Sequence, residues 1–142
     1  MPDLPTVPAL NLAAARAISA AAEAEATAHG WAVAIAVVDQ AGQLLHFLRM
    51  DGCSNASVET ALAKARHAIH FRRSTKFHED RLSEGLIVVL SLPGALPLEG
   101  GVPLLAGEAY VGAVGVSGVQ SAQDGQIAQA GVDALQRWLA EA

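Results

Sequence analysis

The apolar positions of the chain follow helical spacing in some segments and strand spacing in others. Residues 12–29 carry small and aliphatic side chains three and four positions apart, as an amphipathic helix does. Asn11 is a suitable N-cap for this helix, and Gly30 can supply its left-handed end. The first element is therefore expected to be a long helix whose small residues allow close packing on a sheet.

Two hairpins are expected along the chain. Residues 31–38, WAVAIAVV, are apolar at both alternating sets of positions, which indicates a strand covered on each face. A turn containing Gly42 separates this strand from an apolar partner at residues 44–50. Residues 102–105 and 110–116 form the second expected pair, closed by a short turn that contains glycine.

Further helices and one further strand complete the predicted order. About residues 54–71 should form a helix, followed by a shorter helical piece at residues 76–84. Residues 86–92, LIVVLSL, predict a strand, and residues 93–101 predict a loop rich in proline and glycine. A last helix is expected from residue 121 to the C-terminus. The apolar stripe of the helix at residues 54–71 consists of Val58, Leu62, Ala65 and Ile69.

This order of elements predicts an α+β fold. Two hairpins separated by helices favour an antiparallel sheet of about five strands with helices packed on its faces. Residues 1–9 are expected to form an extended tail, because three prolines disfavour helix there. Residues 10–142 are expected to form a single domain that is large enough to bury a core without disulfide bonds or metal ions.

Composition narrows the classes of function. Hydrophobic residues make up 52% of the chain and charged residues 16%, against about 25% charged residues in typical soluble domains. Such an excess of apolar surface predicts a homo-oligomer. The net charge of −5 argues against a nucleic-acid partner. The lone Cys53 implies no oxidising compartment, and with no targeting or membrane-spanning segment in view we expect a soluble cytoplasmic protein.

Candidate chemistry is concentrated in residues 64–75, KARHAIHFRRST. Histidines three positions apart on a helix can converge on one centre, and arginines suit carboxylates and phosphates. At 100° per residue the imidazoles point away from the apolar stripe, so we expect them to face a ligand or another subunit. A solvated helix face and ordinary cations at a helix C-terminus are the alternative interpretations. The residues concerned are Lys64, His67, His70, Arg72 and Arg73, with His78 as a further candidate ligand.

Glycines form a second candidate feature. Gly112, Gly115 and Gly118 recur within a predicted strand, where glycine costs stability unless another group must approach closely. A helix, a neighbouring subunit or a flat ligand could be that group. Gly100 and Gly101 could expose backbone amides to an anion, although most such pairs are only turns.

Five blocks of the sequence carry a family resemblance. They are IAVVDQAGQLLHFLRMDG, ALAKARHAIHFRRST, GGVPLL, VGAVGVSG and QDGQIAQAGVDAL, and their order along residues 10–138 resembles the GlcG/HbpS/PduO C-terminal family, a haem-degrading, DUF336-like family. The resemblance implies a profilin-like antiparallel sheet and symmetric oligomers, often octamers. It also implies haem binding or haem degradation linked to redox sensing in some members, and other roles beside corrinoid adenosyltransferases or catabolic genes.

Three hypotheses for function follow from the residues and the resemblance. The first is an oligomeric binding protein for haem or a related tetrapyrrole with an accessory or sensing role. In that case His67, His70 or His78 would bind the iron, and Arg72 or Arg73 would meet the propionates. The second is a small catabolic enzyme that acts on a carboxylated metabolite, and the third is a structural oligomer without a ligand.

Overall fold

The computed structural model describes residues 3–141 and confirms the α+β class. Helices and strands follow one another in the predicted order, except for a 3₁₀ helix in place of one strand. The bounds are α1 (Leu12–Ala28), β1 (Ala34–Asp39), β2 (Leu44–Arg49), α2 (Asn55–Phe71), α3 (Thr75–Ser83), η1 (Ile87–Ser91), β3 (Gly101–Ala106), β4 (Ala109–Ser117) and α4 (Ser121–Ala140).

The four strands form one antiparallel sheet in the order β2-β1-β4-β3. Each predicted hairpin pairs as expected, and β1 pairs with β4 to join the two hairpins. The sheet therefore has four strands within residues 3–141, and the expectation of about five is wrong by one.

The missing strand is the apolar segment at residues 86–92. It forms η1, which packs beside α3, and only Val89 of this helix is buried. Ile87 is 73% exposed and Leu90 is 64% exposed. A short apolar run is compatible with either a strand or a helix, so its pattern could not decide the conformation. The run is also not part of the core, although its composition predicts burial.

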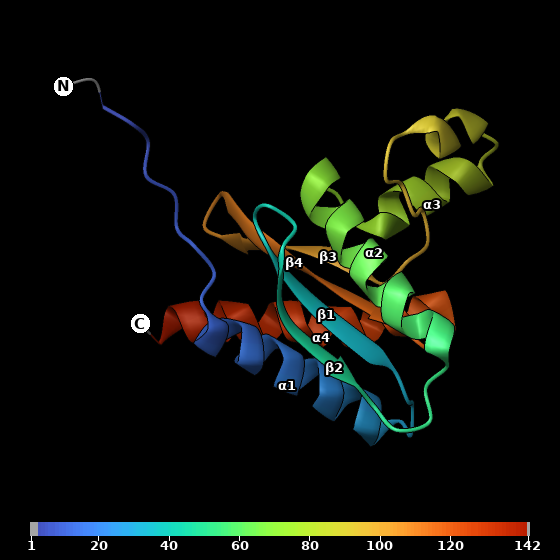
Figure 1. The fold of residues 1–142 in the computed structure, drawn as a ribbon, viewed down its shortest axis with the longest axis horizontal. Helices are drawn as coiled ribbons and strands as arrows, with labels where there is room; N and C mark the ends of the chain where they lie inside the picture. Colours follow the sequence, from blue (N-terminus) through green and yellow to red (C-terminus); the bar gives the residue numbers. More distant parts are fainter. Residues whose placement is uncertain (1–2, 142) are drawn as a thin grey trace.

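Helices cover both faces of the sheet, and the two faces differ in the size of their side chains. α1 and α4 lie side by side on one face (Figure 1), where aliphatic residues of helices and strands form the larger core. α2 covers the opposite face, where alanines of the helix meet alanines of β1 and β4. The larger core includes Ile18, Ile35, Val37, Leu104, Val114 and Ile127.

The N-terminal part of α1 forms as its residues predict. The Asn11 side chain accepts a hydrogen bond from the Ala14 amide at 2.8 Å, and Gly30 adopts a positive φ after the helix. Residues 3–9 contain no helix or strand and run away from the sheet (Figure 1). Residues 1 and 2 of the predicted tail lie outside the described residues, as does residue 142.

α2 is rotated relative to the orientation that its bulkiest residues predict. Val58 and Leu62 were expected to face the core, but both are only half-buried. Ala65 and Ile69 of the predicted stripe are buried as expected, and Ala61 and Ala68 join them against the sheet. The sheet presents mainly alanines and Gly115 where α2 crosses β1 and β4, so the helix comes close enough that small side chains fill the space.

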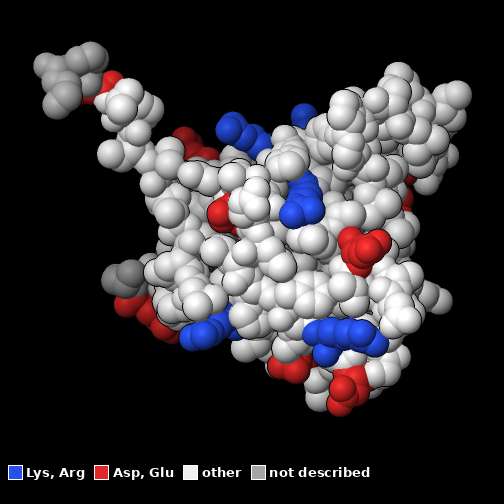
Figure 2. Space-filling model, viewed as in Figure 1, with Lys and Arg blue, Asp and Glu red and all other residues white. Residues whose placement is uncertain are grey.

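Charged side chains are sparse over much of the surface. Figure 2 shows isolated blue and red groups on an otherwise uncharged face. Along residues 3–141, no helix is both long enough and apolar enough to span a bilayer.

Candidate functional site

The structure separates the candidate residues into four surroundings. It does not bring the imidazoles together at one cavity, which corrects the expectation that both histidines of α2 face the same ligand. Lys64, Gly100 and Gly101 lie in the interior, and His67 pairs with His78. His70 and Arg72 line outer grooves, and the guanidinium of Arg73, between α2 and α3, lies over the Phe77 ring.

Lys64 forms a buried ion pair that joins α2 to β4 and α4. Its Nζ donates to the Val116 carbonyl at 2.9 Å and to Asp124 Oδ2 at 3.0 Å. Asp124 also accepts from the Val119 amide at 3.1 Å. Burial raises the pKa of Asp124, and the charge of Lys64 opposes that rise. Because Lys64 is fully buried and engaged, it is a structural anchor instead of the ligand-binding residue that we expected.

Gly100 and Gly101 contribute to the same anchor. The Gly101 amide donates to the Thr75 hydroxyl at 2.9 Å, so this amide is not free to hold an anion. A Cβ on Gly100 would lie 2.8 Å from Lys64 Nζ, and a Cβ on Gly101 would lie 2.8 Å from the Lys64 carbonyl carbon. Both glycines therefore allow the chain to pack closely around Lys64.

The glycines of β4 make room for protein. A Cβ on Gly115 would clash with the Ala61 carbonyl oxygen and would lie 2.5 Å from the Ala65 amide nitrogen. Gly112 and Gly118 are approached in the same way by the backbone of β1 and of the residues just before it. Of the three alternatives raised by the sequence, a helix is the one that meets Gly115, and no space for a flat ligand remains there.

His67 and His78 form a hydrogen-bonded pair beneath the loop that follows η1. His67 is 1% exposed; its Nε2 lies 2.8 Å from His78 Nδ1, and its Nδ1 accepts from the Leu96 amide at 2.9 Å. Burial, with a smaller effect of His78, lowers the pKa of His67 to about 4. As predicted, the His67 side chain points away from the sheet. It is nevertheless buried, because α3 and the loop after η1 cover that side of α2.

These contacts fix the positions of the protons in the pair. The Leu96 amide can only donate, so Nδ1 of His67 accepts and neutral His67 carries its hydrogen on Nε2. That hydrogen is donated to His78 Nδ1, which leaves neutral His78 with its hydrogen on Nε2. Neither ring therefore has a free lone pair to offer an iron atom, and His70 remains as the available imidazole of the three.

His70 lies on the outer surface of α2 and separates two grooves. Its ring rests against Gly42 in the β1–β2 turn, where a larger residue would displace the imidazole. A groove of about 330 Å³ on one side includes Arg72. A mostly apolar groove of about 490 Å³ on the other side includes Arg66. The remaining lining residues are Gln40, Ile69 and Tyr110 in the first groove and Glu59, Leu62, Ala63 and Gly94 in the second.

Arg66 and Tyr110 are site residues that the candidate set did not include. Arg66 Nε donates to the Gly42 carbonyl at 3.1 Å, and the Arg72 guanidinium lies 5.3 Å from the centre of the Tyr110 ring. The position of Arg66 one helical turn before His70 is a signal that the sequence contains. Tyr110 comes from the distant β4 and carries no such signal.

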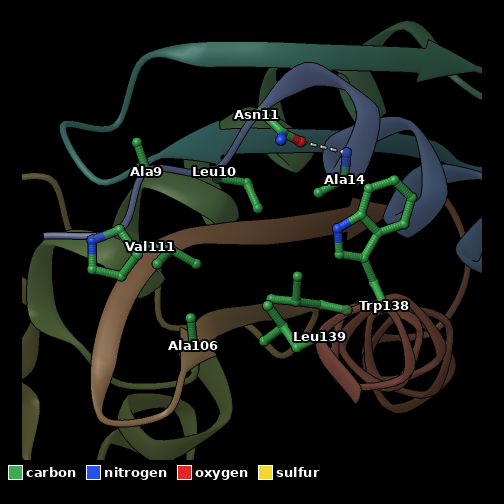
Figure 3. A pocket seen from close by; sticks show the side chains of 10 residues that line it. Ala9, Leu10, Asn11, Ala14, Ala106, Val111, Trp138 and Leu139 are labelled. Carbon is green, nitrogen blue, oxygen red and sulfur yellow. Dashed lines mark hydrogen bonds between the residues drawn. The ribbon is translucent and has the colours of Figure 1, made fainter. Parts of the chain in front are cut away.

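A small apolar cavity was not predicted either. It has a volume of about 120 Å³ and lies between the start of α1 and the end of α4 (Figure 3). Trp138 of α4 extends toward Ala14 of α1, and Asn11 Oδ1 accepts the hydrogen bond from the Ala14 amide. The cavity lining contains no titratable side chain.

Comparisons with known proteins identify the family. The structure resembles that of Klebsiella pneumoniae protein ORFY, with a TM-score of 0.88 and 32% sequence identity. The match covers 96% of this chain and 97% of ORFY. The structure of the PduOC:heme complex matches with 25% identity, a TM-score of 0.81, and 89% and 95% coverage. Protein GlcG of Escherichia coli K12 is 42% identical over 103 residues, which cover 72% of this chain and 77% of GlcG.

The family model described as "Haem degrading protein HbpS-like" matches residues 10–133. The chain therefore belongs to the HbpS-like family, as the five sequence blocks indicated.

Proposed function

We propose that this protein binds haem or a related tetrapyrrole as an oligomer and acts as an accessory or sensing component. The observation that carries the proposal is the position of His70, an exposed imidazole between a mostly apolar groove and neighbouring arginines. The family match and the likeness to PduOC in its heme complex support the same conclusion.

The residues around His70 fit a haem group. A histidine that binds haem iron needs an available ring nitrogen. No hydrogen bond within residues 3–141 engages the His70 ring, whose Nε2 lies close to Gly42. Leu62 and Ala63 form an apolar wall, while Arg66 and Arg72 offer guanidinium groups for propionates. Bound haem supplies redox chemistry at its iron, and this chain's residues hold and orient the macrocycle.

A second copy of the chain completes the proposed site. Both grooves are open to solvent, so one chain leaves part of a bound flat ligand uncovered. Exposed aliphatic residues such as Ile87 and Leu90 remain elsewhere on the surface, as expected for a chain that associates with itself. We therefore propose that haem binding and self-association are linked.

Hemin titration of the purified protein tests this function. We expect a Soret band distinct from that of free hemin, and a weakening of hemin binding by about tenfold or more in His70→Ala, because an axial ligand is lost. His29→Ala is a matched control, since His29 is also exposed but lies near Glu25 and Trp31. The native mass should be measured with and without hemin.

Each outcome of the titration has a distinct meaning. A wild-type spectrum identical to that of free hemin would remove the proposed function. A wild-type spectrum that persists in His70→Ala would remove the assignment of His70 and leave haem binding in place. A monomeric mass in the presence of bound hemin would contradict the link to self-association.

A further inference from the structure

A second cavity, separate from the grooves at His70, lies between α3 and η1. Its volume is about 210 Å³, below the roughly 300–1,000 Å³ of sites for drug-sized ligands, so it suits a short chain or a single ring. Three side chains of α3, Phe77, His78 and Arg81, form one part of the lining. The rest is aliphatic and consists of Leu86, Val88, Val89 and Leu92.

His78 places a hydrogen-bond donor in this cavity lining. Its side chain is only 9% exposed, and its Nδ1 accepts from His67. The hydrogen on Nε2 has no acceptor among residues 3–141, and this nitrogen is not one of the fully enclosed atoms that lack a partner. Burial and the charges of Arg73 and Arg81 lower the pKa of His78, so the neutral ring that donates from Nε2 is the form present at neutral pH.

Two guanidinium groups lie beside the cavity, over the ring of Phe77. Arg73 and Arg81 lie 4.1 Å and 4.5 Å from the centre of the Phe77 ring. Glu84 is the acidic partner of Arg81, at 3.9 Å, and Arg73 forms no ion pair within the described part of the chain. Positive charge beside an apolar wall, together with a donor that lacks an acceptor, matches a ligand with an anionic head and an apolar body.

We propose that this cavity binds a small apolar carboxylate. The carboxylate accepts the hydrogen of His78 Nε2 and meets the guanidinium of Arg81, and the apolar body lies against Val88 and Leu92. The class of ligand is a medium-chain fatty acid or an aryl carboxylate. This site is distinct from the one at His70 and does not depend on the proposed haem function.

Titration with octanoate and octan-1-ol tests the proposal on the full chain. Calorimetry should show octanoate binding at least about tenfold more tightly than octan-1-ol, because only the carboxylate can use the charged hydrogen bonds. The ¹⁵N resonance of His78 Nε2 should shift on addition of octanoate. Equal affinity for the two compounds, or an unmoved His78 resonance, would overturn the proposal.

Three variants localise the site. Val88 is 59% exposed, so Val88→Trp can fill the cavity without disturbing the core, and we expect it to abolish octanoate binding. Arg81→Ala should weaken octanoate binding by about tenfold and leave octan-1-ol unaffected. Arg49→Ala is the control for loss of an exposed arginine. Wild-type affinity in Val88→Trp would place octanoate elsewhere and refute the site, whereas His70→Ala should bind octanoate normally.

Discussion

The two faces of the sheet are built differently. The face under α1 and α4 is held by branched aliphatic side chains, such as Ile35 and Val114, in a continuous core. The face under α2 is held by alanines, glycine and a buried ion pair between Lys64 and Asp124. Stability on the first face comes from apolar burial, which tolerates modest changes in shape. On the second face it depends on backbone proximity and on polar groups that each need a particular partner.

This difference explains how α2 carries both buried and exposed basic and histidine side chains. A helix that sits close to a sheet of small residues brings its longer polar side chains to its flanks and ends. There they are either satisfied internally, as Lys64 and His67 are, or exposed, as His70 is. Internally satisfied positions and exposed positions therefore alternate along one helix.

The largest expected difference between the faces concerns the ion pair. Lys64→Met should reduce the free energy of unfolding by about 3–5 kcal/mol, because Asp124 is left buried without its partner. Ile18→Val on the other face should cost only about 1 kcal/mol. Urea unfolding of both variants measures the comparison. The double variant Lys64→Met with Asp124→Leu should recover much of the loss, and no recovery would show that the cost is not electrostatic.

The next effect is a pH dependence confined to the α2 side. The folded pKa of His67, about 4, lies below its ordinary value of 6.5. The contribution to stability is therefore fully present above pH 6.5 and is lost as the pH falls toward 4, where the unfolded chain takes up the proton first. The loss amounts to about 3 kcal/mol.

Urea unfolding at pH 7.5 and at pH 4.5 tests this dependence. His67→Gln cannot titrate and should be less sensitive to acid than the wild type, with His78 still contributing in the same direction. His29→Gln, at an exposed position, should match the wild type. An unchanged pH profile in His67→Gln would refute the assignment.

The smallest expected effect is a difference in stability between two glycine-to-alanine variants, one on each face of the sheet. Gly115→Ala should cost about 2–3 kcal/mol, because its Cβ meets the backbone of α2, which cannot move aside without shifting the helix. Gly131→Ala, between α4 and α1, should cost less, about 1 kcal/mol, because the new Cβ lies no closer than 3.0 Å to a methyl group of Ile18 and 3.2 Å to its carbonyl oxygen, and alanine favours the helix. Thermal unfolding of the two variants measures the difference, and equal costs would contradict the contrast between the faces.

Much of the fold could be predicted from local pattern. The helix from Asn11 to about Gly30, the helix that ends at Phe71 and both hairpins have periodicity and boundary residues that agree with each other. The segment at residues 86–92 could not be assigned, because an apolar run of this length has no period that separates a strand from a short helix.

The sequence pointed to the residues of the candidate site but not to their partners in the folded chain. The sequence marked His70 near the end of a helix and Arg72 just past it as candidates, and both line the same groove. It could not show that Lys64 would be paired with Asp124, sixty positions away, or that Leu96 would bind His67. Contacts over such separations depend on how the layers pack, which has no local signature.

The sequence by itself determined the order of most helices and of both hairpins, together with the family, because periodicity, capping residues and the blocks that resemble the family are local properties of the chain. Only the tertiary structure decided which basic side chains are structural and which are available. That decision depends on the rotation of α2 against a sheet of small residues, which seals Lys64 and His67 and leaves His70 at the surface. Burial is a property of the packed layers, so the same residue types one turn apart on a helix take opposite roles.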